Sequence, residues 1–188
     1  MGHHTFDPAM ADRLEDAARR YRYLSMEELV GALQPTGNDV VADLGSGTGF
    51  YADDIAEFAG AVYAVDVQDE MHAHYREKDG GVPENVELVT AEVADLPFGT
   101  DALDAAYTTM TYHEFASAEA FAEIRRVLKE DARFVVADWS SEGSGEIGPP
   151  TDERYSKDEA VGALEDAGFD VERADERTET FLLSANAS

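Results

Sequence analysis

Residues 40–56 read VVADLGSGTGFYADDIA, and this stretch decides the fold. A short apolar run ends at Asp43, a glycine-rich turn spans residues 45–49, and a pattern with helical spacing follows. Strand, tight loop and helix in this order form the opening unit of a doubly wound α/β fold. Glycines let such a loop take positive φ, and the amides of the following helix N-terminus favour a negatively charged ligand group. We therefore expect the loop to hold a nucleoside-bearing small molecule.

Apolar runs and helical patterns alternate along the rest of the chain. Strands joined by helices form a parallel sheet, and right-handed crossovers fix its winding. A short charged turn joins the last two runs, so the final strand must run antiparallel. The predicted strands are 40–44, 61–65, 86–90, 103–108, 134–137, 169–174 and 179–184, and helices are predicted at about 50–59, 69–78, 118–129 and after Ser156.

We predict a single domain over residues 1–188, in which residues 1–36 form a helical N-terminal cap and residues 37–188 form the core. Asp7 before Pro8 begins a helical pattern that continues to Leu24. Capping boxes at Ser25–Glu28 and at Ser156–Glu159 predict two further helix starts. The cap is either a lid over a substrate pocket or a packed segment without substrate contact.

The composition is strongly acidic, with 41 Asp and Glu against 14 Lys and Arg and a net charge of −27. Nucleic acid is not an expected partner, because binding it depends on basic residues that neutralise phosphates. The acidic residues are dispersed, which favours a protein of a salt-rich cytoplasm, where salt screens their repulsion. The chain lacks cysteine and any run of 18 apolar residues, so we expect no disulfide, no thiolate metal site, no membrane span and a cytoplasmic location.

Two cofactor classes use a glycine loop of this kind. A dinucleotide site requires Gly-x-Gly-x-x-Gly, but the third glycine here is Gly49, and Phe50 occupies the position that the dinucleotide pattern needs. A carboxylate at Asp43 would repel a pyrophosphate, whereas it suits the ammonium and sulfonium of S-adenosylmethionine. Asp66 ends the second strand, where an acidic residue accepts the ribose hydroxyls. These features favour S-adenosylmethionine.

The chain resembles the class I S-adenosylmethionine-dependent methyltransferases, in the small-molecule branch similar to quinone-biosynthesis methyltransferases. The resemblance covers nearly the whole chain and rests on VVADLGSGTGFYADDIA, AVYAVDVQDEM, VTAEVADLPF, LDAAYTTMTYHEF and EIRRVLKEDARFVVADW. It implies a seven-stranded Rossmann-like sheet of order 3-2-1-4-5-7-6 whose last strand is antiparallel. It also implies a set of cofactor contacts, namely Asp43, Gly45, Ser46, Gly47, Gly49, Asp66, Val67, Met71, Glu92, Val93 and Thr108.

The exit of the fourth strand carries the candidate proton acceptors Tyr112, His113 and Glu114. His113 has the side chain whose ordinary pKa suits proton transfer at neutral pH, and the alternative is a structural histidine that orients the loop. We expect His72 and His74 to be surface residues and not metal ligands. The predicted activity is methyl transfer to a small-molecule acceptor. A non-catalytic S-adenosylmethionine-binding protein and a nicotinamide-dependent oxidoreductase are the alternatives, and the accepting atom and oligomeric state stay open.

Overall fold

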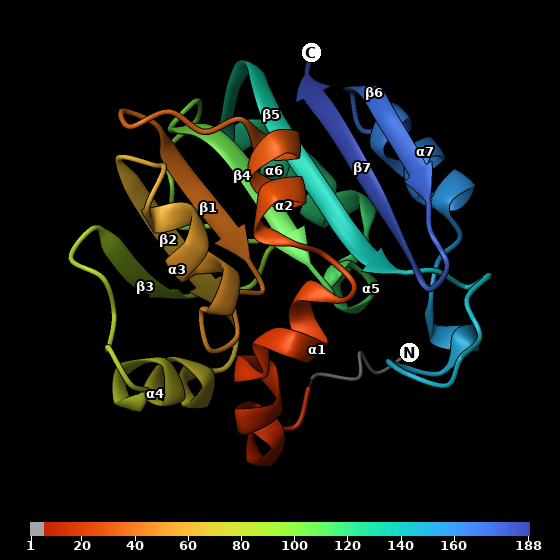
Figure 1. Ribbon diagram of the computed structural model, residues 1–188. Helices are drawn as coiled ribbons and strands as arrows, with labels where there is room; N and C mark the ends of the chain where they lie inside the picture. The colour runs from red at the N-terminus through yellow and green to blue at the C-terminus, as the bar shows by residue number, and fades with distance from the viewer. Residues whose placement is uncertain (1–5) are drawn as a thin grey trace.

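A seven-stranded sheet of order β3-β2-β1-β4-β5-β7-β6 forms the centre of the computed structural model, which describes residues 6–188 (Figure 1). Strands β1 to β5 pair in parallel, and β7 runs antiparallel to both β5 and β6. The predicted fold class and strand order are therefore confirmed. The strands are β1 Val40–Leu44, β2 Ala61–Asp66, β3 Val86–Thr90, β4 Leu103–Thr109, β5 Leu128–Trp139, β6 Phe169–Glu176 and β7 Thr180–Ala187.

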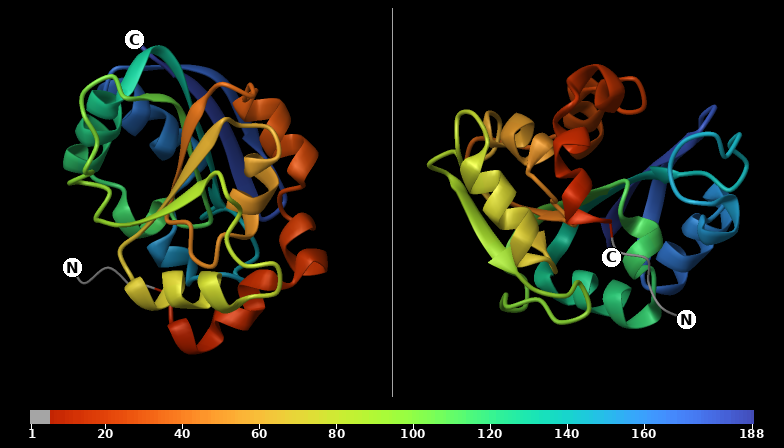
Figure 2. Two further views of the ribbon diagram at one scale, coloured as in Figure 1. Left: turned by 90° about the vertical axis from the view of Figure 1, so that its left-hand side faces the viewer. Right: turned by 90° about the horizontal axis from the view of Figure 1, so that it is seen from below.

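Helices cover both faces of the sheet (Figures 1 and 2). Consecutive residues of β1 point to opposite faces, so Val41 packs in one buried cluster with α2 and α3, and Ala42 packs in the other with α6 and α7. A sheet buried on both faces needs strands that are apolar throughout, which explains the unbroken apolar runs. The covering helices are α2 Met26–Leu33, α3 Phe50–Ala56, α4 Asp69–Glu77, α5 Tyr112–Phe115, α6 Ala118–Val127 and α7 Lys157–Asp166.

The segment before α2 is not the continuous helix that its spacing predicted. It forms a 3-10 helix, η1 Pro8–Glu15, and a short α-helix, α1 Ala17–Tyr21. Asp16 separates them, because its extended backbone ends η1 while its side chain accepts a hydrogen bond from the Arg19 amide and starts α1. Both predicted capping boxes are present, at the starts of α2 and α7. Residues 1–5 of the predicted cap lie outside the described residues.

Strand β5 is longer than predicted, and it begins directly after α6. Leu128 already pairs with Leu103, whereas the sequence pattern had extended the helix to Lys129. Asp131 takes a left-handed conformation with φ +62°, and the register between β4 and β5 shifts in this region. The irregular backbone around Asp131 is therefore a β-bulge inside one extended strand.

The carboxyl ends of β1, β4 and β5 point toward the lower part of Figure 1, where η1 and α1 lie. The chain leaves β1 toward β2 on one side, while β4 lies on the other side, so this edge is the switch point where open α/β sheets bind ligands. Lys78 holds η1 there, because its Nζ lies 3.5 Å from Glu15 and donates to the Thr48 carbonyl at 2.9 Å. Among residues 6–188, no helix combines the length and apolarity that a membrane span needs.

Candidate functional site

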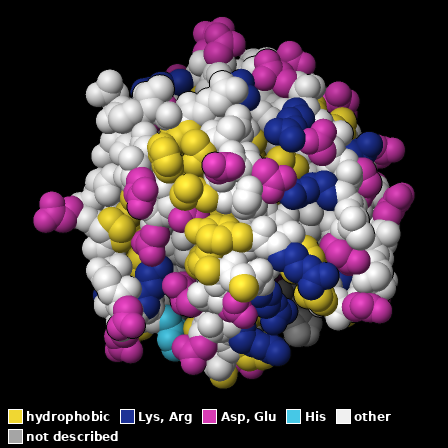
Figure 3. Space-filling model, in the orientation of Figure 1, with side chains coloured by type: hydrophobic (Ala, Val, Ile, Leu, Met, Phe, Trp, Pro, Cys, Tyr) yellow, Lys and Arg dark blue, Asp and Glu magenta, His cyan; other side chains and the backbone are white. Residues whose placement is uncertain are grey.

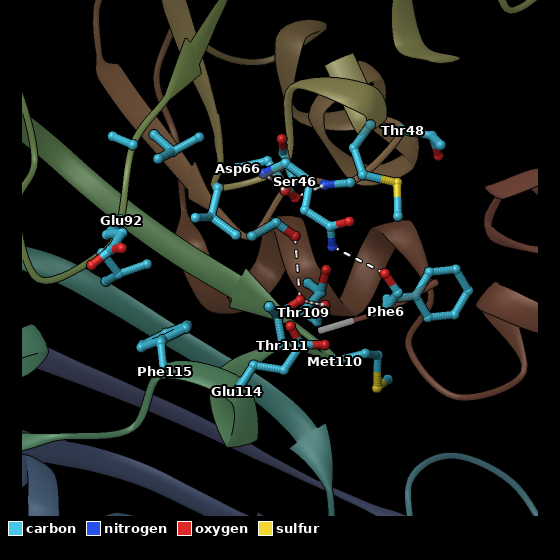
Figure 4. Close-up of a pocket in the computed structure, with 18 of the residues that line it drawn as sticks. Phe6, Ser46, Thr48, Asp66, Glu92, Thr109, Met110, Thr111, Glu114 and Phe115 are labelled. Atoms are coloured by element: carbon cyan, nitrogen blue, oxygen red, sulfur yellow. Dashed lines mark hydrogen bonds between the residues drawn. The ribbon is translucent and has the colours of Figure 1, made fainter. Parts of the chain in front are cut away.

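A cavity of about 340 Å³ opens at this edge of the sheet, between the glycine loop and the end of β4 (Figure 4). Its size suits a small organic ligand. The structure brings eight of the eleven predicted cofactor-contact residues together on its wall. They are Gly45, Ser46, Gly47, Asp66, Val67, Met71, Glu92 and Val93.

The three loop glycines are required for different reasons. Gly45, Gly47 and Gly49 have φ values of +80°, +54° and +77°, which side chains rarely tolerate. A Cβ atom at Gly45 would lie 2.4 Å from Thr111, and one at Gly49 would lie 1.9 Å from Tyr75. Packing therefore explains these two glycines. A Cβ at Gly47 would meet only Leu14, at 3.2 Å, so Gly47 is where the backbone is open to a ligand.

Asp66 links the loop to the end of β2. Its Oδ2 accepts a hydrogen bond from the Gly47 amide at 2.8 Å, and its Oδ1 accepts one from the Gln68 amide at 2.9 Å. Burial raises the pKa of Asp66, although these two amides favour its ionised form. Each carboxylate oxygen can accept a second hydrogen bond, so the side chain fits a partner with two hydroxyl groups.

Asp43, Gly49 and Thr108 lie behind the cavity wall. The carboxyl group of Asp43 is 1% exposed, and burial raises its pKa to about 7. Its Oδ1 has no hydrogen-bond partner within residues 6–188. Thr108 is fully buried, and because side chains alternate along β4, its neighbour Thr109 reaches the cavity instead (Figure 4).

The N-terminal segment, which the sequence left open as a lid or a packed cap, also supplies walls of this cavity. Phe6, Leu14 and Arg20 line the cavity, and Gln68 Nε2 donates to the Phe6 carbonyl at 3.0 Å (Figure 4). A cap that packs away from the site would place no residue there. Sequence reasoning did not identify Leu14 and Arg20, because an apolar or basic residue in a helical pattern gives no information on the face it occupies.

A second cavity, of about 480 Å³, adjoins the first. Aromatic rings form much of its wall, including Tyr23, Tyr51 and Trp139. His113 lies on the wall of this second cavity and not of the first. Five residues line both cavities, so ligands in the two spaces can meet. These shared residues are Phe6, Leu14, Arg20, Met110 and Glu114.

His113 has a partner that its own sequence context did not reveal. Its Nδ1 lies 2.9 Å from Asp138 Oδ2, and its backbone amide donates to the same oxygen at 2.7 Å. Burial alone would lower the pKa of His113, but the Asp138 carboxylate outweighs burial and raises it. Asp138 lies near the end of β5, next to the exit of β4, so strand order brings the pair together. Glu114, which also lines this cavity, has its pKa raised to about 7 by burial.

His72 is buried, so its predicted surface position is wrong. It is fully inaccessible on α4, and its Nδ1 lies 3.1 Å from the Thr90 hydroxyl. The polar residues around it on α4 concealed that this face packs against β3. Burial lowers the pKa of His72, which favours the neutral ring. Within residues 6–188, no group of three or more His, Cys, Asp or Glu is arranged to hold a metal ion.

Comparison with known proteins agrees with this geometry. Residues 42–136 match the family described as "Methyltransferase domain". The crystal structure of a SAM-dependent methyltransferase from Aquifex aeolicus is 31% identical, with a TM-score of 0.87 over 98% of this chain and 100% of that one. The fold, together with the site at the switch point of the sheet, thus defines the class of protein. It is an enzyme that binds a nucleoside-bearing cofactor. The chain belongs to the S-adenosylmethionine-dependent methyltransferase family, and S-adenosylmethionine is its cofactor.

Two curated relatives differ in their named substrates. The chain is 32% identical to a sterol 24-C-methyltransferase of Yarrowia lipolytica, over 70% of this chain and 39% of that protein. It is 30% identical to a demethylmenaquinone methyltransferase of Clavibacter sepedonicus, over 58% of this chain and 45% of that protein. The chain spans less than half the length of both relatives, so the similarity does not determine its acceptor.

Proposed function

We propose that this protein transfers a methyl group from S-adenosylmethionine to a small-molecule acceptor bound in the second cavity. The observation that carries this proposal is the pair of adjoining cavities with five shared wall residues. One cavity is lined by the cofactor motifs, and the other is lined by aromatic rings and a histidine. The 30% identity with the menaquinone-pathway relative supports placing the chain in the small-molecule branch of the family.

The cofactor, when bound, supplies a methyl group that is already activated by its sulfonium. The protein then has to hold two reactants together, and orientation alone contributes roughly 7–11 kcal/mol to well-aligned reactions. Asp66 suits the ribose hydroxyls, and the open backbone at Gly47 allows close approach. The N-terminal residues Phe6 and Leu14 line both cavities. Binding and orientation are therefore the main tasks of these side chains.

We assign His113 the removal of a proton from acceptors that bind protonated. Asp138 occupies the Nδ1 side of the ring, which leaves Nε2 as the nitrogen that can serve the acceptor. A neighbouring carboxylate also makes the imidazole a stronger base, because it stabilises the protonated ring. An acceptor with a soft nucleophile, such as a thiolate, would not need this step.

The test combines binding and turnover. Calorimetry measures the affinity of the first cavity for S-adenosylhomocysteine. We expect the Asp66→Asn variant to have a lower affinity. A screen of metabolite extracts then follows conversion of S-adenosylmethionine to S-adenosylhomocysteine. Cofactor binding with acceptor-dependent turnover supports the proposal. Binding without turnover under every extract would favour a non-catalytic binding protein, and failure to bind would reject the site.

The acidic surface supports a further part of this proposal, namely function in a salt-rich cytoplasm. The net charge is −27 in 188 residues. At molar salt the Debye length falls to about 3 Å, so dispersed carboxylates no longer repel one another strongly. The dependence of stability on salt, described below, tests this assignment.

A further inference from the structure

Basic residues are concentrated on the wall of the second cavity. Arg13, Arg19 and Arg20 all line it, although the whole chain has only 14 Lys and Arg against 41 Asp and Glu. They come from η1 and α1, two short elements next to each other. Figure 3 shows dark-blue side chains gathered low in the view, over this N-terminal segment, on a face otherwise rich in acidic side chains. The cavity is therefore an exception to the charge of the molecule.

None of these three arginines forms an ion pair within the described residues. Among residues 6–188, none of them has a carboxylate within ion-pair distance, whereas bases elsewhere, such as Lys78 and Arg177, do. Within residues 6–188, the hydrogen bond of the Arg13 guanidinium is donated to the Met10 sulfur at 3.3 Å. In a chain with such an excess of acids, three unpaired arginines at one cavity indicate a site that is completed by a ligand.

Of the three arginines, Arg20 has the energetically least favourable position, because part of its guanidinium is buried without a partner. Its Nε is buried and has no hydrogen-bond partner in the described chain. The guanidinium lies 4.8 Å from the ring centroid of Tyr51 and 5.6 Å from that of Phe50, so aromatic faces provide part of its stabilisation. Burial lowers the pKa of Arg20, and the carboxylates of Asp43 and Glu15, which act from beyond ion-pair distance, offset this only in part. An anion entering the cavity would supply the missing partner.

Three acids also line this cavity, but they leave the arginines unpaired. The side chain of Asp7 accepts a hydrogen bond from the Ala9 amide at the start of η1, at 3.0 Å. Glu114 is partly buried and lines both cavities, and Glu153 lies in η2 Thr151–Glu153. None lies within 4.0 Å of an arginine nitrogen, since the described residues show no such ion pair. The positive wall is therefore available to a ligand.

The rest of the cavity is apolar and aromatic. Tyr23 and Trp139 stand edge to face with their ring centroids 4.9 Å apart, and Pro149 and Pro150 extend this surface. We propose that the methyl acceptor is an amphipathic anion, with an apolar, ring-sized body against Trp139 and a carboxylate or phosphate bound by Arg13 and Arg19. This inference rests on the proposed function. A neutral sterol or quinone would leave the arginines without a partner.

Trp139 is the single tryptophan of the chain and lies on this wall, so its fluorescence reports occupancy directly. The probe pair is 3-phenylpropanoate and its neutral amide, 3-phenylpropanamide, titrated at one fixed KCl concentration. We expect the acid to change Trp139 fluorescence and to bind at least about tenfold more tightly than the amide, because charge-assisted bonds to arginine are lost in the amide. Tighter binding of 2-phenylethyl phosphate than of the acid would assign the anion as a phosphate.

The double variant Arg13→Gln and Arg19→Gln keeps Arg20 but should lose most of the preference for the acid over the amide. Arg76→Gln is the control, because it makes the same kind of substitution, with loss of one positive charge, at an exposed position on α4 that lines neither cavity. Equal binding of acid and amide by the wild type, no binding of either, or a preference that survives undiminished in the double variant would each overturn the inference.

Calorimetry with S-adenosylhomocysteine separates this outcome from failure of the proposed function. Arg13 and Arg19 do not line the first cavity, so the double variant should bind S-adenosylhomocysteine like the wild type. Normal cofactor binding without an acid preference would reject the anionic acceptor alone. Loss of cofactor binding in the wild type would reject the proposed function, whatever the fluorescence titration shows.

Discussion

Replacement of Asp43 by Asn should change how stability depends on pH. Asp43 is the residue before the end of β1 and is 1% exposed, and burial raises its pKa from 3.8 to about 7. A raised carboxyl pKa means that folding favours the protonated form. The contribution of Asp43 to stability is therefore fully present below about pH 4 and is lost as pH rises through about 7. At 1.36 kcal/mol per pKa unit, the loss is about 4 kcal/mol.

In the Asp43→Asn variant this pH-dependent loss is absent. A buried amide carries its own penalty, roughly 1–3 kcal/mol for an unsatisfied group, but that penalty is the same at every pH. Relative to wild type, the free energy of unfolding of the variant should thus rise by about 4 kcal/mol between pH 4 and pH 8. Urea denaturation of both proteins across this range, at constant KCl, measures the difference.

Asp12→Asn is the control, because Asp12 is exposed on η1 and its removal should leave the pH dependence close to that of wild type. Parallel curves for the Asp43→Asn variant and the wild type would refute the argument. They would mean that Asp43 ionises in the folded protein at the same pH as in the unfolded chain. A cofactor that places its ammonium near Asp43 should instead lower this pKa, so proton release on binding near pH 6 provides a second measurement.

Four further predictions follow from the site and the surface. Asp66→Ala should weaken S-adenosylmethionine binding by roughly 1.5–3 kcal/mol for each lost charge-assisted hydrogen bond, measured by calorimetry, and unchanged affinity would remove Asp66 from the site. Gly47→Val should abolish binding, because it puts a branched side chain at positive φ where the ligand approaches, and normal binding would show that the loop is not the site. The melting temperature should rise steadily from about 0.1 to 2 M KCl as screening increases, and a flat curve would contradict the salt assignment. Turnover should increase as pH rises through the raised pKa of His113, and His113→Ala should remove that dependence and reduce turnover about 10²–10⁴-fold with little change in cofactor affinity; wild-type turnover in the variant would exclude it as a base.

The sheet and the first cavity could be predicted because their signals are local. Apolar runs, glycine punctuation and the turn before β7 determine strand order through general rules of chain connection. The loop at residues 45–49 follows β1, and Asp66 is the last residue of the neighbouring strand β2. Because these strands are parallel, both had to lie at the same edge of the sheet. The alternation of side chains also explains why the predicted contact on β4 moves by one residue, so that Thr109 and not Thr108 faces the cavity.

The second cavity could not be predicted because it depends on contacts between distant segments. His113 and Asp138 belong to different strand exits, and neither residue type identifies the other as its partner. Arg20 has the same sequence signature as any exposed base on a helix, yet it is turned inward by the break at Asp16. The extension of β5 likewise depends on pairing with β4, which overrides the helical pattern up to Lys129.

The division of the shared wall has a consequence for how this architecture diversifies. Phe6, Leu14 and Arg20 come from one short stretch that precedes the sheet, whereas the cofactor motifs lie within the β1 to β4 half of the core. Exchange of that stretch would remodel the acceptor space and the part of the cofactor wall that it shares, while the glycine loop and Asp66 are retained. New substrate preferences can therefore arise by grafting a contiguous module of fewer than about 20 residues, a far smaller step than redesigning loops scattered over the whole domain.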